Sequence, residues 1–543
     1  MKKFCVAKKG SGEMKRRVLC AMFAVLFVLS GCTSQKEVVD IDVSEVGVLP
    51  IVDEPITVEW FHPLMNSNVL KSLNDQYCWQ EIQERTGINI EWIHPSVGTE
   101  KDNLNIAIAS RDLPDIITWS WRSHSGGPNK AIEDEVIIKL NDYMKLAPNY
   151  AKILEENEFA NKNARLDDGS LYGFCHTVEN PQILCTAGFI MRKDWLDKLQ
   201  LSVPKTIDEW YKVLKAFKTQ DPNGNGKADE IPYVSDKSGH FKIMSTAFGV
   251  RSGFYVDPKT DKVVYGPIQP QYKEYISTMA KWYQEGLIDP DYITNERKNV
   301  DAKVLNEQAG AYYGTITSQL GGYITQKADS NPDFALTPVN SPVDSNGISY
   351  SNLDSRVCGV GDQCITITTT NPYKAQTVRL LDYIFSEEGR TLTNWGKEGE
   401  SYEIVDGKKK FTDKILKNPD GLSPVDAIAP YAFPIYGYAG PFDMDSFMSI
   451  SQQYPVQKEA SEVWLTESTD MLMPVLYPTV EESTRYAQLM SEISTYYNEM
   501  FHKFVLGKEP VDKFDEYVKT IKQLGIDEAV SILQAQYDRS KTR

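Results

Sequence analysis

The sequence predicts an α/β fold with a parallel sheet, in a chain long enough for about two large domains. At 543 residues the chain is too long for one small core. Its composition, 41% hydrophobic and 24% charged, is typical of a globular protein. Apolar strand-like runs alternate with helical periodicity over residues 56–119, and this βαβαβ pattern favours parallel strands with helices on the sheet faces.

The first residues are typical of an export signal. Residues 15–17 are basic, residues 18–29 are apolar, and the run ends in Leu29-Ser30-Gly31-Cys32. A basic start, a short apolar run and small residues predict a secretory signal, and the run is too short for a comfortable membrane span. The last four residues resemble the bacterial lipobox, whose cysteine receives a lipid such as palmitate. We therefore predict a signal peptide over 1–31, lipid attachment at Cys32 and a polar tether over 32–54; the alternative is a plain signal peptide with a coincidental cysteine.

Charge and cysteine content exclude two broad classes of protein. The 75 acidic and 58 basic residues give a formal charge of −17, and such a surface repels nucleic acid. Beyond Cys32, five cysteines remain, and their spacing matches no zinc pattern. Cys175 could pair with Cys185, and Cys358 with Cys364, or all could be scattered buried thiols. We therefore expect neither a nucleic-acid-binding protein nor a disulfide scaffold.

The first predicted sheet places aromatic residues where ligands usually bind. Strands are expected over 56–61, 88–93 and 115–119, with helices over 69–85, ended by Gly87, and 100–110. In parallel sheets ligands bind beyond the carboxyl ends of the strands. Flat rings cover the apolar face of a sugar, and Arg supplies hydrogen bonds. This position selects Trp60, Trp119, Trp121 and Arg122 as candidates for a sugar site; the alternative is that the tryptophans pack the sheet end.

Local signals also predict most of the later elements. Thr206, with Glu209 three residues on, predicts the start of a helix over 207–218, and residues 479–482 form a second capping box that opens a helix to about 506. Further predicted elements are a hairpin turn at 166–173, strands over 187–191 and 364–369, a short strand ending near 316, helices over 272–285, 372–385, 511–524 and 527–535, and a loop-rich crossing over 341–361.

Residues 221–230, in sequence DPNGNGKADE, resemble an EF-hand-type loop. Oxygen-bearing side chains alternate, and Gly226 falls where such a loop turns sharply. Ca²⁺ takes about six to eight oxygen ligands, which this alternation would aim inward. Pro232 replaces the usual final Glu, so Glu230 is the substitute. The alternative is an ordinary Asn/Gly-rich turn. The predicted structural Ca²⁺ ligands are Asp221, Asn223, Asn225, the Lys227 carbonyl, Asp229 and Glu230.

Several short segments in order resemble one protein family. They are residues 113–116 (LPDI), 168–173 (DGSLYG), 191–196 (MRKDWL), 204–210 (PKTIDEW), the metal loop and 386–390 (SEEGR). Together they are similar to the family 1 extracellular solute-binding proteins of bacterial ABC importers, particularly LipO-type lipoproteins, and to alginate-oligosaccharide-binding proteins. The resemblance runs from about residue 55 to the C-terminus.

The resemblance implies a two-lobe periplasmic-binding-protein (Venus-flytrap) fold with parallel-sheet lobes, hinge crossings and a helical C-terminal part. It places the first lobe in 55–180, the second lobe with the metal loop in 181–345, a return to the first lobe in 346–400 and a mostly helical part shared between the lobes in 401–543. The sugar would lie between the lobes. By family analogy and aromatic character, Arg192, Tyr312, Trp395 and Tyr436 join the four strand-end residues as cleft candidates.

The function implied is capture without chemistry. The chain is expected to be a monomeric, non-enzymatic receptor, anchored by lipid on the outer face of the cell membrane. It would bind an oligosaccharide and deliver it to an ABC transporter permease with its ATPase. Two alternatives are a surface glycan-degrading enzyme, which needs two carboxylates about 5–5.5 or 6.5–9.5 Å apart, and a sugar-sensing receptor without transport.

Overall fold

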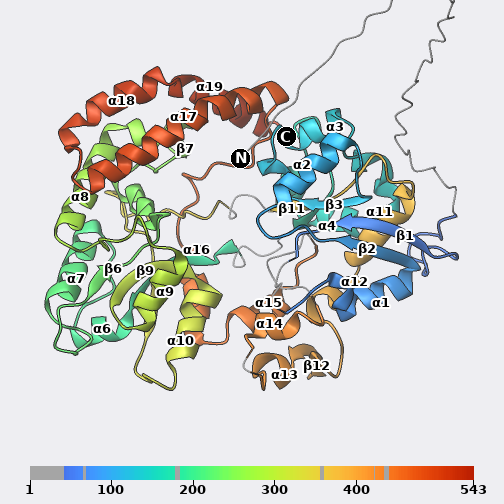
Figure 1. The fold of residues 1–543 in the computed structure, drawn as a ribbon, viewed down its shortest axis with the longest axis horizontal. Coiled ribbons are helices and arrows are strands. Elements are labelled where there is room, and N and C mark those ends of the chain that lie inside the picture. The colour runs from blue at the N-terminus through green and yellow to red at the C-terminus, as the bar shows by residue number, and fades with distance from the viewer. Residues whose placement is uncertain (1–41, 65–68, 178–183, 355–359, 421, 433–439) are drawn as a thin grey trace, which may run out of the picture. The chain divides into compact units, whose positions relative to one another are not determined.

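The computed structural model describes residues 42–64, 69–177, 184–354, 360–420, 422–432 and 440–543 (Figure 1). The predicted signal peptide, Cys32 and Tyr436 lie outside these residues. No helix in the described ranges combines the length and the apolar character needed to cross a membrane.

The first sheet has a parallel centre and two added antiparallel strands. Its order is β2-β1-β3-β11-β4, formed by β2 Ile88–Ile93, β1 Ile56–Phe61, β3 Ile116–Trp119, β11 Val360–Ile367 and β4 Phe174–Thr177. Strand β1 pairs in parallel with β2 and β3, as the βαβαβ pattern predicts. Strand β11 runs antiparallel to β3 and β4, so the sheet is mixed. Helices α1 Tyr77–Thr86, α2 Glu100–Ser110 and α11 Lys374–Ile384 belong to this part of the chain (Figure 1).

The helix expected over 69–85 begins later than predicted. Ser72 caps a separate 3-10 turn, Leu73–Asp75, through a capping box, and Gln76 is extended. Helix α1 therefore starts at Tyr77, and it ends as expected at Gly87, whose φ of 74° suits glycine. The apolar residues before Ser72 have the spacing of a helix, but no capping residue precedes them to start one, so the predicted start was too early.

The second sheet has the order β10-β5-β9-β6, from β10 Leu336–Val339, β5 Ala187–Arg192, β9 Ala309–Thr315 and β6 Ile231–Tyr233. Strands β6 and β9 are parallel, whereas β5 is antiparallel to both β9 and β10. Helix α7, Ile207–Thr219, begins with the predicted Thr206–Glu209 capping box. Other helices of this part are α6 Lys193–Lys198, α8 Pro270–Gln284, α9 Arg297–Leu305, α10 Gly322–Lys327 and α16 Pro455–Leu465.

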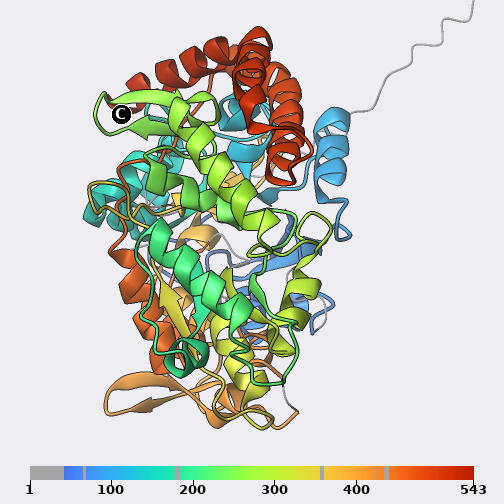
Figure 2. The same ribbon diagram turned by 90° about the vertical axis from the view of Figure 1, so that its left-hand side faces the viewer.

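The last helices of the chain pack on the hydrophobic core around the second sheet (Figure 1 and Figure 2). Helix α17, Val480–Val505, starts with the predicted Thr479–Glu482 capping box and packs Ile493, Phe501 and neighbouring residues with Tyr272 and Tyr275 of α8. Helices α18 Phe514–Gln523 and α19 Ile526–Ser540 follow, and α19 lies against the hairpin of β7 Phe254–Asp257 and β8 Lys262–Tyr265.

The segment before α16 is less helical than expected. A hairpin of β12 Tyr402–Val405 and β13 Lys408–Phe411 stands between helix α12 Glu387–Trp395 and the short helices α13 Asp413–Leu416, α14 Pro424–Ile428 and α15 Met444–Ser451. Two short strands around an Asp406-Gly407 turn were not recognised because three lysines fill one of them.

The chain visits each sheet twice. It passes from β4 to β5, returns from β10 to β11, and enters the second sheet's surroundings again at α16, which packs on β10. The disulfide Cys175–Cys364 joins the two visits to the first sheet. Neither of the two pairings that the sequence left open occurs, and Cys175 and Cys364 are not scattered thiols either: they face each other in the register of β4 and β11. Neighbours in a sheet, rather than in sequence, determined the pair.

Candidate ligand-binding site

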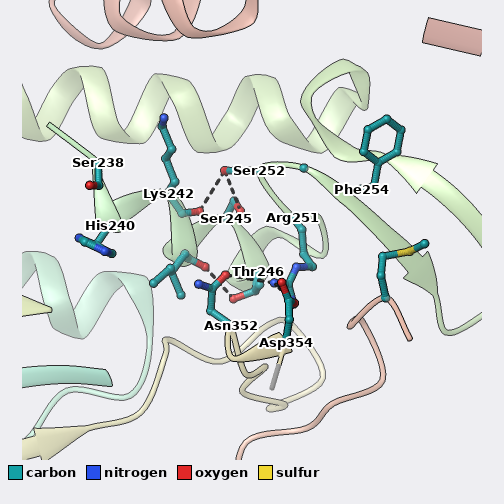
Figure 3. A pocket seen from close by; sticks show the side chains of 14 residues that line it. Ser238, His240, Lys242, Ser245, Thr246, Arg251, Ser252, Phe254, Asn352 and Asp354 are labelled. Carbon is teal, nitrogen blue, oxygen red and sulfur yellow. Dashed lines mark hydrogen bonds and ion pairs between the residues drawn. The ribbon is translucent and has the colours of Figure 1, made fainter. Parts of the chain in front are cut away.

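A polar cavity of about 430 Å³ lies beside the second sheet (Figure 3). Its first residues follow the carboxyl end of β6, and its residue His240 stacks on Tyr313 near the carboxyl end of β9. Cavities of about 300–1,000 Å³ are typical of ligand sites, and the ends of parallel strands are their usual place. The side chains labelled around it in Figure 3 are Ser238, His240, Lys242, Ser245, Thr246, Arg251, Ser252, Phe254, Asn352 and Asp354.

Hydrogen bonds from two tyrosines of helix α8 hold the segments that form the cavity wall. A 3-10 helix, His240–Phe248, lies between Gly239 and Gly249, both with positive φ. The Tyr275 hydroxyl donates to the Phe241 carbonyl at 3.1 Å, and the Tyr272 hydroxyl donates to Ser252 Oγ at 3.0 Å. Because both tyrosines belong to the buried core, the backbone that carries the cavity side chains is preorganised.

Arg251 connects the two segments that form the floor of the cavity. Its guanidinium donates to the Ser351 carbonyl at 2.9 Å and to Asn352 Oδ1 at 3.0 Å, and it lies 3.8 Å from the Asp354 carboxylate. Only 11% of the Arg251 side chain is exposed, against 73% for Asp354. Burial lowers the pKa of Arg251, opposed by the charge of Asp354.

His240 and Lys242 form the opposite wall. The His240 ring stacks on Tyr313 with centroids 4.7 Å apart, and burial lowers its pKa. The Lys242 ammonium lies over the Phe501 ring at 4.7 Å and near Asn498 Oδ1 at 3.5 Å. Burial lowers the pKa of Lys242 to about 8. The cavity thus offers donors, acceptors and ring faces within one site.

The tryptophans predicted at the end of the first sheet have different surroundings. Trp60 is fully buried and its indole donates to Thr118 Oγ1 at 2.8 Å. Trp121 is also fully buried and donates to Thr366 Oγ1 at 3.1 Å. These two rings pack the sheet end. Trp119 and Arg122 are only partly buried, and Trp119 meets Phe61 edge to face.

The candidates chosen by family analogy are also buried. Arg192, 1% exposed, lies between the rings of Trp195 and Phe334 and pairs with Asp194 at 2.5 Å. Tyr312 is fully buried and donates to the Gln319 carbonyl. Trp395 packs on Phe411 in a separate small core. In the described structure these side chains contact protein, so among the candidates that it describes only Trp119 and Arg122 have the exposure that ligand contact needs; the role itself stays a prediction.

None of the residues that line the cavity was predicted from the sequence. The strand before it, Ile231–Tyr233, has three residues and contains Pro232, so it did not read as a strand. The cavity also combines residues 238–254 with residues 352–354, which are about a hundred positions apart. The one usable signal was the run of Arg251, Ser252 and Phe254 around Gly253, polar and aromatic side chains in a loop.

The loop of residues 221–230 is closed by its own side chains. Asp221 accepts hydrogen bonds from the amides of Asn225 and Gly226, and the side chains of Asn223 and Asn225 donate to Asp229. Gly224 and Gly226 both have a φ of 72°. Within the described ranges, no three His, Cys, Asp or Glu side chains are close enough together to hold a metal ion.

Glu230 is the feature of this loop that fits a cation. It is 2% exposed, and its Oε1 has no hydrogen-bond partner among the described residues. Burial raises the pKa of Glu230, and the charges of Asp221 and Asp229 raise it further. A buried carboxylate oxygen without a donor, in the field of two further negative charges, is a group that a divalent cation stabilises, although the three carboxylates do not converge closely enough in this structure to hold one.

Comparison with known proteins gives consistent matches. The model of the family described as "Bacterial extracellular solute-binding protein" matches residues 71–391. The fructooligosaccharide ABC transporter substrate-binding protein FusA of Streptococcus pneumoniae serotype 4 is 27% identical over 95% of this chain and 96% of its own. Lipoprotein LipO of Bacillus subtilis is 25% identical over 88% and 90%. The crystal structure of alginate-binding protein AlgQ2 without calcium ion superposes with a TM-score of 0.70, at 24% identity, over 90% of this chain and 99% of that one. The predicted two-lobe α/β fold is thereby confirmed.

Proposed function

Since this chain belongs to the bacterial extracellular solute-binding proteins, we propose that it captures an oligosaccharide at the Arg251 cavity and delivers it to an ABC transporter permease. The cavity carries the proposal, because it combines a buried guanidinium, hydroxyl and amide groups and a phenyl ring. Sugars need such a combination, since each ring has both hydroxyl edges and an apolar face. The full-length relative FusA, named for fructooligosaccharide and for an ABC transporter, supports both the ligand class and the partner.

Capture would work by a shift between open and closed states. A ligand that contacts both lobes favours the closed state by its extra affinity for it, and the closed form would then dock on the permease. Trp119 and Arg122, at the carboxyl end of β3, are our candidates for the contact from the first sheet. The proposed lobes keep the boundaries predicted from the sequence, with residues 401–543 shared between them.

Anchoring would hold the receptor beside its partner. We propose that Cys32 carries a lipid and that the residues after it form a tether, so that the chain is displayed on the outer face of the cell membrane as a monomer. The tether is shorter than the predicted one, because Ile51 and Val52 are buried in the core of the first sheet. The name of LipO, which marks that relative as a lipoprotein, supports the anchor. Loss of lipid labelling in a Cys32→Ala variant, with release of the protein into the medium, is the expected result of the direct test.

A structural calcium ion is proposed at residues 221–230. The groups that would hold it are Asp221, Asn223, Asn225, the Lys227 carbonyl, Asp229 and Glu230. The unpartnered oxygen of Glu230 supports the proposal, since a hard cation would satisfy it. When bound, the ion would offset two of the three negative charges of these carboxylates and stiffen the connection from α7 to β6.

A thermal-shift screen with product analysis tests the proposed function. A neutral and acidic oligosaccharide panel is expected to contain sugars that raise the melting temperature while no shorter product appears, because binding only the folded state stabilises it. The variant Arg251→Ala should lose this rise, and Arg485→Ala, which alters an exposed arginine on α17, should keep it. Accumulation of product would identify an enzyme. A melt that responds to peptides and to no sugar would refute the carbohydrate assignment.

A further inference from the structure

The geometry points to an acidic oligosaccharide, one that carries uronate carboxylates, as the ligand of the Arg251 cavity, with Lys242 and Arg251 as its anion-recognising groups. This inference rests on the proposed function and specifies its substrate class. Three observations support it: the charge balance of the cavity, the surroundings of Lys242 and the loose pairing of Arg251.

The cavity is cationic in an acidic protein. Its lining contains Lys242 and Arg251, and Asp354 is the one carboxylate among the described residues that line it. The whole chain carries −17, and a net negative field repels anions at long range. The cavity therefore has a local excess of positive charge, opposite in sign to the net charge of the chain. Such a cavity can attract an anionic group at short range.

Lys242 is partly buried without a counter-ion. Within the described part of the chain no carboxylate pairs with its ammonium, which instead lies over Phe501 at 4.7 Å and Tyr497 at 5.6 Å. Among the residues that the structure describes, the one hydrogen-bond acceptor of this ammonium is Asn498 Oδ1, at the long distance of 3.5 Å. Burying an ammonium without a partner is unfavourable, and a ligand carboxylate would remove that penalty.

The Arg251 guanidinium lies closer to two neutral hydrogen-bond acceptors than to the carboxylate of Asp354. Its short bonds go to the Ser351 carbonyl and Asn352 Oδ1, whereas the Asp354 oxygen is 3.8 Å away, with most of the Asp354 side chain in solvent. A guanidinium fixed by neutral acceptors keeps its charge available for a carboxylate, which it can bind by two parallel hydrogen bonds. Arg251 and Lys242 lie on different sides of the cavity (Figure 3), so they would recognise separate carboxylates of an oligosaccharide that carries more than one.

A neutral sugar would use this cavity poorly. It would displace water from Lys242 and accept hydrogen bonds through uncharged hydroxyls, without the ion pair that a carboxylate forms with an ammonium or a guanidinium. The expected preference is therefore a difference in affinity between acidic and neutral oligosaccharides of equal length.

Calorimetric titration with matched sugars tests this inference. The acidic probes are trimers to pentamers of galacturonate and of alginate; the neutral probes are galactan, mannan and fructan oligomers of the same lengths. We expect an acidic series to bind at least about tenfold more tightly than any neutral one, a difference of about 1.4 kcal/mol. The affinity should also fall as salt rises from 20 to 300 mM, since counter-ions screen the attraction.

Three variants separate charge from packing. Lys242→Met keeps the aliphatic stem against Phe501 and should lower acidic affinity about tenfold while neutral affinity stays unchanged; Lys242→Arg, which keeps the charge, should retain most of it. Lys273→Met, at a partly exposed position of α8, is the control. Neutral sugars binding as tightly as acidic ones, or unchanged acidic affinity in a folded Lys242→Met variant, would overturn the inference and leave carbohydrate capture standing. If no glycan of either kind binds, the proposed function fails and this inference fails with it.

Discussion

Replacing Glu230 by Gln should have opposite effects with and without calcium. In chelator, the wild-type protein buries the Glu230 carboxylate with one oxygen unpartnered and with Asp221 and Asp229 nearby. The substitution removes a charge from that site and keeps the shape of the side chain. We therefore expect Glu230→Gln to be more stable than wild type in chelator and less stabilised than wild type by calcium.

The magnitudes follow from burial and mass action. Burying a polar group without a partner costs about 1–3 kcal/mol, and more when the group is charged, so removal of the Glu230 charge should raise the melting temperature in chelator by about 1–3 °C in a chain of this length. Calcium at about 100 times its dissociation constant adds about 2.7 kcal/mol to the wild type. Loss of one carboxylate ligand should reduce that gain by about 1.4 kcal/mol for each tenfold loss of affinity.

The pH dependence gives an independent check. Because the folded-state pKa of Glu230 is raised, the folded protein binds this proton more tightly than the unfolded chain does. In chelator, wild-type stability should therefore fall as pH rises through the raised pKa, and Glu230→Gln should show a shallower decline. Sugar affinity at low temperature should not change, because the loop and the cavity share no residue.

The assay is differential scanning calorimetry of wild type, Glu230→Gln and the exposed control Glu274→Gln, each with chelator or with calcium, together with elemental analysis. Glu274→Gln should match wild type in both buffers. If calcium does not change the wild-type melt and no metal is found, residues 221–230 are an ordinary turn. If Glu230→Gln destabilises the protein in chelator, the account of Glu230 as an electrostatically strained group is refuted.

The remaining predictions concern the disulfide, the C-terminal helix and the cavity lysine. Joining residues 189 positions apart removes much loop entropy, so Cys175→Ser with Cys364→Ser should cost up to about 5 kcal/mol, and a reductant should lower the melting temperature of wild type but not of this variant. Arg539 pairs with Asp167 at 3.0 Å and with Glu482 at 2.5 Å. The substitution Arg539→Ala should lower the free energy of unfolding by about 1 kcal/mol, measured as a lower midpoint of urea unfolding. An unchanged midpoint would mean that solvent screening cancels the contribution of these ion pairs. Affinity for an acidic sugar should decline between pH 7 and 9.5 as Lys242 loses its proton, since the pKa of Lys242 in the protein without ligand is about 8. The titratable groups around Lys242 are His240 on its own element and Tyr497 and His502 on α17. Burial lowers the pKa of both histidines, that of His502 to about 4, and raises the pKa of Tyr497 to about 12. None of these groups therefore titrates between pH 7 and 9.5, and the affinity of Lys242→Met should not change with pH over this range.

Much of the fold could be predicted because its signals are local. A capping box at Thr206 or Thr479 acts within four residues, and Gly87 ends its helix by adopting a φ that other residues avoid. Alternation of strands and helices over residues 56–119 implies the parallel pairing of β1 with β2 and β3, since the crossover helices leave little choice. The glycines and oxygen-bearing side chains of residues 221–230 likewise mark a tight loop from neighbouring positions alone.

The candidate site depended on tertiary contacts, which no local pattern contains. Trp60 and Arg192 had the right chemistry for a sugar, but their burial is decided by strands and helices that are distant in sequence. Cys175 met Cys364 only because β11 inserts beside β4, and Arg251 met Asn352 because two loops about a hundred residues apart converge. By itself the sequence determined many of the elements, two capping boxes and the family resemblance, since these depend on neighbours along the chain. Only the tertiary structure decided which side chains remain exposed to a ligand, because exposure depends on everything that packs around them.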